Sequence, residues 1–195
     1  MTGVVDFHFD FASPYGFLTA MKVDAVLPRD RVRWRPFLLG AVYKSVGQSP
    51  LEHPLKRRYV IEIDVPRLAR REGLTIKVPA GFPEHSLPAA RAFYWIEARA
   101  SEKAPDFAKA AYRKFWLDGR STADPEVALE AAAMLGFERA EVREGLQDEA
   151  VKQRLVAENE HALARGVFGS PFFMVDGEPF WGSEWLVDVV ERLVA

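Results

Sequence analysis

The chain has 195 residues, of which 49% are hydrophobic, so it can form one domain with a large core or a core domain with an inserted subdomain. Its 26 Lys and Arg residues nearly balance its 28 Asp and Glu residues, which argues against a nucleic-acid-binding surface, because such a surface needs clustered excess cations. The sequence contains no cysteine, which excludes disulfides, Cys-x-x-Cys zinc sites and redox chemistry by a thiol of the protein itself.

The sequence shows no targeting or membrane signal. Its N-terminus lacks the charged and apolar regions of a signal peptide, and no apolar run approaches the roughly 18 residues of a spanning helix. We therefore expect a cytoplasmic protein that binds neither membranes nor nucleic acid.

The N-terminal part of the chain predicts a strand, a helix and a second strand. Apolar and polar residues alternate over residues 4–11, which predicts the first strand. Ser13 and Pro14 are residue types favoured at a helix N-cap and at the first helical position, so a helix is expected over residues 13–27. The second strand is predicted over residues 32–39, and a helix between two strands implies that they are parallel.

The middle of the chain is predicted to be helical. A loop is expected over residues 40–54, which contain Gly47 and Pro50. Helical patterns then follow over residues 55–72, 87–100, 105–117, 125–135, 140–145 and 148–165. We assign residues 46–159 to a helical insertion subdomain, and residues 1–45 and 160–195 to the core domain.

The C-terminal segment returns to strands. Residues 172–175 and 178–181 flank Asp176-Gly177, a strong β-hairpin signal, and Ser183 is the predicted N-cap of a last helix. The resulting order is β-α-β, a helical block, then β-β-α. This is the layout of an α/β, thioredoxin-like fold with an all-helical insertion.

Ser13-Pro14-Tyr15-Gly16 occupies the place where redox proteins of this layout carry Cys-x-x-Cys. Free N–H groups and the helix dipole favour an anion at a helix N-terminus. Because Ser13 and Gly16 replace both cysteines, a thiolate at this site must come from a ligand, and glutathione is the candidate. Alternatively, Ser13 only caps the helix.

Two further segments suit an extended peptide ligand. A cis bond before Pro171 would turn the backbone of Ser170 toward such a peptide, whereas a trans proline would only begin the strand. The helix start at Ser183, next to Trp181, would suit the carboxylate of a γ-glutamyl group, and Glu184 would suit its ammonium. Alternatively, these residues only begin an ordinary capped helix.

The remaining polar residues give weaker signals. The histidines lack the spacing of a metal site, so no metal is expected, and His8 is interpreted as a hydrogen-bonded structural residue. The run Lys56-Arg57-Arg58 is either a solvated face or a group that holds a carboxylate.

The sequence resembles the bacterial 2-hydroxychromene-2-carboxylate isomerases and the related kappa-class glutathione transferases. The resemblance is carried by V-D-F-H-F-D-F-A-S-P-Y-G-F-L, R-P-F-L-L-G, G-Q-S-P and G-V-F-G-S-P-F-F-M-V-D-G-E-P-F-W-G-S-E-W-L. It covers essentially the whole chain. It implies a DsbA-like thioredoxin fold, a homodimer and glutathione as cofactor.

The resemblance also implies roles for individual residues. Ser13 would hold the glutathione sulfur, and Ser170, before Pro171, would pair with the cysteinyl backbone. Further glutathione-binding positions fall on Gln48, Lys56, Trp181, Ser183 and Glu184, and the second substrate would be bordered by Lys44 and His85. Three residues depart from the usual pattern, because Glu184 replaces an Asp, Trp185 replaces an Arg, and His85 stands where the isomerases often carry Asn.

The implied reaction is the glutathione-dependent conversion of 2-hydroxychromene-2-carboxylate, a small aromatic carboxylate, to trans-o-hydroxybenzylidenepyruvate in aromatic hydrocarbon catabolism. One alternative is a kappa-class-like glutathione transferase, which would release the conjugate. The other is a non-catalytic glutathione-binding member of the fold.

Overall fold

A computed structural model describes residues 3–47, 51 and 53–194. Its four-stranded sheet has the order β2-β1-β3-β4. The strands are β1 (Val5–Phe9), β2 (Val32–Pro36), β3 (Phe172–Val175) and β4 (Glu178–Trp181). Strand β1 is parallel to β2 and antiparallel to β3, which forms a hairpin with β4. The predicted parallel pair and terminal hairpin are confirmed.

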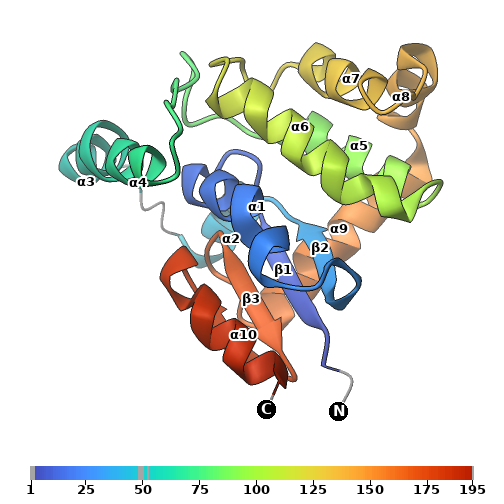
Figure 1. Cartoon of the computed structure of the whole chain (residues 1–195). Coiled ribbons are helices and arrows are strands. Elements are labelled where there is room, and N and C mark those ends of the chain that lie inside the picture. Colours follow the sequence, from blue (N-terminus) through green and yellow to red (C-terminus); the bar gives the residue numbers. More distant parts are fainter. Residues whose placement is uncertain (1–2, 48–50, 52, 195) are drawn as a thin grey trace.

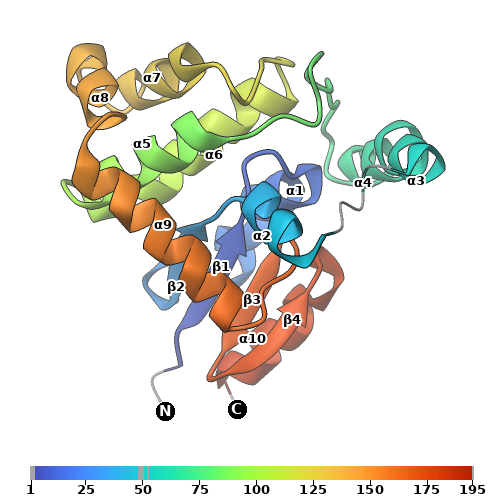
Figure 2. The same cartoon turned by 180° about the vertical axis from the view of Figure 1, so that it is seen from behind.

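Helices cover both faces of the sheet. Figure 1 shows α1 (Pro14–Val26) and α10 (Leu186–Val194) on one face, and Figure 2 shows α2 (Leu39–Val46) and α9 (Glu149–Ala164) on the other. Since both faces are covered, every residue of β1 is buried. Phe7 stacks on Phe173 and contacts Trp34 edge-on, which places the aromatic core between the sheet and its helices.

The helical insertion lies above one end of the sheet in Figure 1. Its main helices are α5 (Leu87–Glu97), α6 (Ala104–Trp116), α7 (Pro125–Ala133) and α8 (Arg139–Gly145). Short 3-10 turns are η1 (Arg29–Arg31), η3 (Ser101–Lys103) and η4 (Ser183–Trp185). The aromatic residues of α6 are buried at its contact with α1, so this helix joins the insertion to the core domain.

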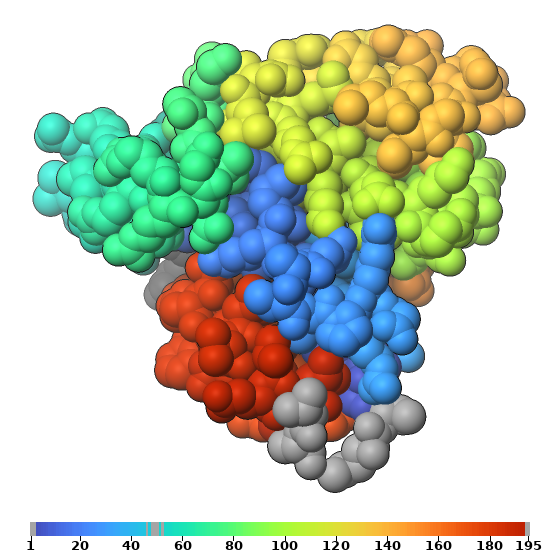
Figure 3. Space-filling view, viewed as in Figure 1, coloured from blue at the N-terminus to red at the C-terminus, as the bar shows by residue number. Residues whose placement is uncertain are grey.

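A separate helical arm is formed by α3 (Pro54–Arg58), the π segment η2 (Tyr59–Asp64) and α4 (Val65–Arg71), and it projects from the body in Figure 3. Pro66 explains the π segment, because proline has no N–H and its ring clashes with the carbonyl four residues earlier, which is that of Glu62. The arm contacts α1 through α4. The predicted helix over residues 55–72 is therefore present with one wide turn.

The structure corrects the sequence-based expectations for residues 37–46 and for Ser183. Strand β2 ends at Pro36, and α2 occupies residues expected to be loop, ending where Gly47 adopts a left-handed φ of 69°. Ser183 is not an N-cap, because it begins η4 and makes no capping hydrogen bond there. Residue 159, where the sequence-based division places the end of the insertion, lies inside α9, which contacts both α5 and α2, and the division itself stays a prediction.

His8 also differs from expectation. It is fully buried, and neither ring nitrogen has a hydrogen-bond partner among the described residues. Burial, with the charges of Arg35 and Arg165, lowers the pKa of His8 to about 3 against the opposing charge of Asp6. His8 is therefore a neutral core residue. No helix in the described ranges is both long and apolar enough to cross a membrane.

Candidate functional site

Ser13 lies at the N-terminus of α1 with an extended backbone and a buried side chain. Its hydroxyl donates to the carbonyl of Ser170 at 2.9 Å and accepts from the amide of Gly16 at 3.1 Å. The second contact is an N-cap, as the sequence predicted. The first contact joins the two segments that the sequence singled out, although they are 157 residues apart.

The first turn of α1 presents a donor. Pro14 has no N–H, and the amides of Gly16 and Phe17 donate to Ser13. No partner for the Tyr15 amide is found in the described part of the chain. An N–H group at the positive end of a helix favours an anion, so this turn can accept a thiolate or carboxylate.

The second segment contains the cis bond that the sequence allowed. The Ser170–Pro171 peptide bond is cis, and both residues are buried. The hydroxyl of Ser170 accepts from the amide of Asp10 at 2.9 Å. Ser170 is therefore held through both its side chain and its carbonyl.

Gly16 has no room for a side chain. A Cβ there would lie 2.6 Å from the hydroxyl of Tyr112 and 2.7 Å from that of Ser170. These distances are shorter than real Cβ contacts, so a cysteine could not occupy this position without displacing Tyr112 or Ser170. The packing, as well as the composition, therefore opposes a Cys-x-x-Cys pair.

An exposed aromatic surface lies beside Ser170. Trp181 is 55% exposed and contacts Phe168, with 4.8 Å between their ring centroids. Its indole also covers Gly169, where a Cβ would lie 2.1 Å from the indole nitrogen. Trp181 is thus held next to the loop before the cis bond.

Ser183 and Glu184 belong to η4, which contacts α1. The exposed Glu184 side chain folds over Gly182, where an added Cβ would lie 2.3 Å from a carboxylate oxygen. The charge of Glu184 contributes to raising the pKa of Tyr15, after burial and the hydrogen bond and charge of Asp64. The structure therefore brings Glu184 near the start of α1.

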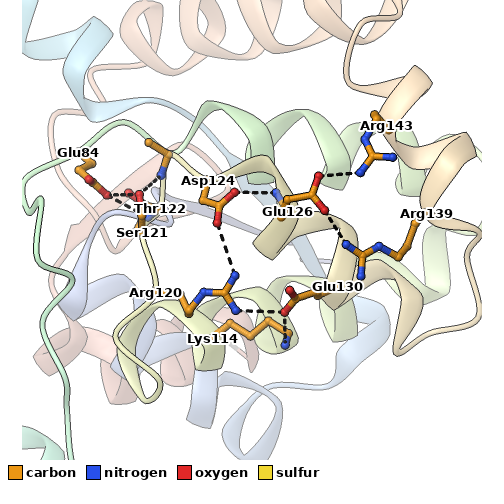
Figure 4. A network of polar contacts seen from close by, with 11 residues as sticks. Glu84, Lys114, Arg120, Ser121, Thr122, Asp124, Glu126, Glu130, Arg139 and Arg143 are labelled. Atoms are coloured by element: carbon orange, nitrogen blue, oxygen red, sulfur yellow. Dashed lines mark hydrogen bonds and ion pairs between the residues drawn. The ribbon is translucent and has the colours of Figure 1, made fainter.

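His85 lies in a segment that the insertion holds in place. Its carbonyl accepts from Thr122, and the neighbouring Glu84 accepts from Ser121 and Thr122 in the network of Figure 4. His85 is exposed, and the next residue, Ser86, donates from its hydroxyl to the buried Asp10 carboxylate. The structure thus places it on the same side as Ser13.

Lys44 and Lys56 make no hydrogen bond with Ser13 among the described residues. Lys44 is exposed in the last turn of α2, and Lys56 is exposed on α3. Gln48 lies outside the described residues. The roles of these three side chains stay predictions.

Two residues near the site, Asp10 and Tyr15, have no role predicted from the sequence patterns. Asp10 contacts Ser170 and the loop before α1, and Tyr15 donates to Asp64 of the helical arm at 2.8 Å. Asp10 carried a weak signal, because it is the last of the alternating polar residues of the strand pattern and lies three residues before Ser13. Nothing local indicated the Tyr15–Asp64 pair.

The family follows from a match over nearly the whole sequence. Residues 4–194 match the sequence model of the DSBA-like thioredoxin domain. The chain belongs to the DSBA-like thioredoxin domain family. Within the described residues of this DSBA-like chain, no group of three or more acidic or histidine side chains is arranged to hold a metal ion.

Two curated relatives of this DSBA-like protein are named 2-hydroxychromene-2-carboxylate isomerase. The protein from Sphingobium xenophagum is 29% identical over 95% of each chain. The protein from Pseudomonas putida is 25% identical over 94% of this chain and 90% of its own. A solved 2-hydroxychromene-2-carboxylate isomerase structure superposes with a TM-score of 0.86 at 23% identity, covering 98% of this chain and 94% of the other, which supports the fold.

Proposed function

We propose that this protein is a glutathione-dependent isomerase that converts 2-hydroxychromene-2-carboxylate to trans-o-hydroxybenzylidenepyruvate. The observation that carries the proposal is the Ser13–Ser170 contact at the start of α1 in a chain without cysteine. The N-terminus of a helix favours an anion, and the protein has no thiol of its own to supply one. The names of the curated relatives support the substrate.

The residues at the start of α1 fit a bound thiol peptide. The Tyr15 amide can donate to the sulfur, and the Ser13 hydroxyl can do so once it turns away from the Ser170 carbonyl, to which it donates in the free protein. Both donors stabilise the thiolate more than the thiol. The backbone of Ser170 can pair with an extended peptide, and Glu184 can accept from an ammonium group. When bound, glutathione supplies a nucleophile that adds reversibly to a conjugated carbon, so that a double bond becomes a rotatable single bond.

The protein's own contribution is ionisation and orientation. Ser13 stabilises the anion and does not attack the substrate. The exposed rings of Trp181 and Phe168 beside Ser170 offer an apolar wall for an aromatic substrate or for the peptide stem. Aligning the reacting atoms against such a wall removes much of the entropic barrier.

The proposal is tested by incubating the purified protein with 2-hydroxychromene-2-carboxylate, with and without glutathione, and separating the products by chromatography. We expect the trans product only when glutathione is present, with glutathione recovered unchanged. The matched control replaces glutathione by its analogue with α-aminobutyrate in place of cysteine, which should bind but give no product.

Each alternative function has its own outcome. A stable glutathione conjugate would identify a transferase, and binding without turnover would identify a non-catalytic protein; both results overturn the isomerase. Trp181→Ala should weaken glutathione binding, whereas Trp185→Ala, which removes another half-exposed indole, should not.

A homodimer and a cytoplasmic location complete the proposal. Light scattering of the purified protein tests the dimer, and fractionation of cells that express it tests the location.

A further inference from the structure

Asp10 is a buried carboxylate at the end of β1 for which the proposed reaction gives no role. It is only 4% exposed. Its carboxylate accepts from the amide of Ala12 at 2.8 Å, from the amide of Leu39 at 2.7 Å and from the hydroxyl of Ser86. These three donors come from three separate segments of the chain.

The backbone of Asp10 makes further contacts at the same place. Its amide donates to the hydroxyl of Ser170, and its carbonyl accepts from the amide of Ser13 at 2.8 Å and from the hydroxyl of Tyr112 at 2.9 Å. One residue therefore contacts the loop of Ser13, the loop of Ser170 and helix α6 of the insertion.

The side-chain contacts reach the segments expected to border the second substrate. Leu39 begins α2, which carries Lys44, and Ser86 follows His85. Ser86 is itself fully buried, and the network of Figure 4 holds its segment from the other side through Glu84. The Asp10 carboxylate thus accepts hydrogen bonds both from Leu39 of the core domain and from Ser86 of the insertion.

A purely electrostatic role for this carboxylate is disfavoured. A negative charge beside a bound thiolate opposes ionisation of the thiol. Burial also raises the pKa of Asp10, against the hydrogen bonds from Ser86, Ala12 and Leu39 and the charge of His85. Burial of the Asp10 carboxylate therefore costs free energy. A role in holding the surrounding segments in place explains why a carboxylate is found there.

We propose that Asp10 is a positioning residue that holds the Ser13 loop, the start of α2 and the Ser86 segment in one geometry, so that the thiolate and the second substrate are aligned. The proposal rests on the proposed function. Small misplacements of reacting groups lower the rate far more than they lower binding, so the expected defect is in kcat.

The test compares Asp10→Asn with wild type and with the control Asp6→Asn. Asn keeps the shape, but its NH2 group faces one of the donors. Asp6 is a suitable control because it lies on β1, four residues before Asp10, is 8% exposed and pairs with Arg35 and Arg165. The turnover rate is expressed per glutathione-binding site counted by calorimetry, so that unfolded protein does not contribute.

We expect Asp10→Asn to lower kcat per site by about ten- to a hundredfold, with the KM for glutathione changed by less than about threefold. Asp6→Asn should lower the unfolding temperature and leave kcat per site unchanged. A kcat per site within about threefold of wild type in Asp10→Asn would overturn the positioning role.

A second readout needs no ligand. Amide hydrogen exchange of the free protein should show faster exchange at Ala12 and Leu39 in Asp10→Asn and not in Asp6→Asn; unchanged exchange at both amides overturns the proposal. If the wild type neither binds glutathione nor turns over the substrate, the proposed function fails, and the exchange result still decides whether Asp10 holds these segments.

Discussion

The hydroxyl of Ser13 donates its only hydrogen to the carbonyl of Ser170, at 2.9 Å. The hydroxyl must therefore turn away from Ser170 before it can donate to a ligand thiolate. That rotation frees the Ser170 carbonyl to accept from the ligand backbone. The two groups thus satisfy each other in the free protein.

Ser13→Ala removes the donor to the thiolate and the N-cap of α1. A hydrogen bond to a charged group contributes about 1.5–3 kcal/mol, so the titration midpoint of the bound glutathione thiol should rise by roughly one to two pH units. Loss of the cap should cost about 1 kcal/mol of stability. The ultraviolet absorbance of the thiolate against pH measures the first effect, and urea unfolding measures the second.

The control for this experiment is Asp148→Ala. Asp148 caps α9 by accepting from the amide of Ala150 at 2.8 Å, away from the site. It should lose a similar stability and leave the thiol titration as in wild type. Coincident titrations of wild type and Ser13→Ala would show that Ser13 is only a helix cap.

Gly16→Ala should destabilise the protein, because the added Cβ would meet the hydroxyls of Tyr112 and Ser170 at 2.6 and 2.7 Å. Crowding of this kind costs about 1–3 kcal/mol. Gly40→Ala is the matched control, since no heavy atom lies within 4 Å of its Cβ position in α2 and alanine favours a helix by up to about 1 kcal/mol. Equal unfolding free energies for the two variants would contradict the crowding.

His8→Phe should reduce the loss of stability in acid. The pKa of His8 is about 3 in the folded protein, below its ordinary value of 6.5, so the unfolded chain binds more protons between these pH values. Stability therefore falls as the pH drops below about 6.5, by about 2 kcal/mol between pH 7 and pH 5 from this group alone. Urea unfolding at both pH values should show that this part of the loss is absent in His8→Phe. The same loss in both proteins would mean that His8 titrates normally.

Tyr15→Phe should loosen the helical arm over residues 54–71. It removes the hydrogen bond to Asp64, at 2.8 Å, and this should cost about 1 kcal/mol. Amide exchange in the arm should accelerate while exchange in the sheet stays unchanged. Tyr59→Phe is the control, because Tyr59 is 48% exposed and its hydroxyl has no hydrogen-bond partner among the described residues. Arm exchange equal to wild type in Tyr15→Phe would mean that other contacts hold the arm.

Local patterns in the sequence predicted much of the fold, and they singled out Ser13 and Ser170, which the structure brings into contact. Ser13 and Pro14 specify a helix start, Asp176-Gly177 specifies a hairpin, and both are present as predicted. Each signal depends on the backbone preferences of a few adjacent residues, which act wherever the segment lies. The absence of cysteine excluded redox chemistry by the protein's own thiols without any structure.

Only the tertiary structure decided what surrounds Ser13. Ser86 and Tyr112 reach Asp10 from 76 and 102 residues away, and the same packing closes the Gly16 position to a side chain. Helix α2 likewise begins at Leu39, and the amide of Leu39 donates a hydrogen bond to the Asp10 carboxylate. These contacts form when segments that are far apart in the sequence meet in the packed core. The local preferences of a few adjacent residues do not specify which distant segments will meet.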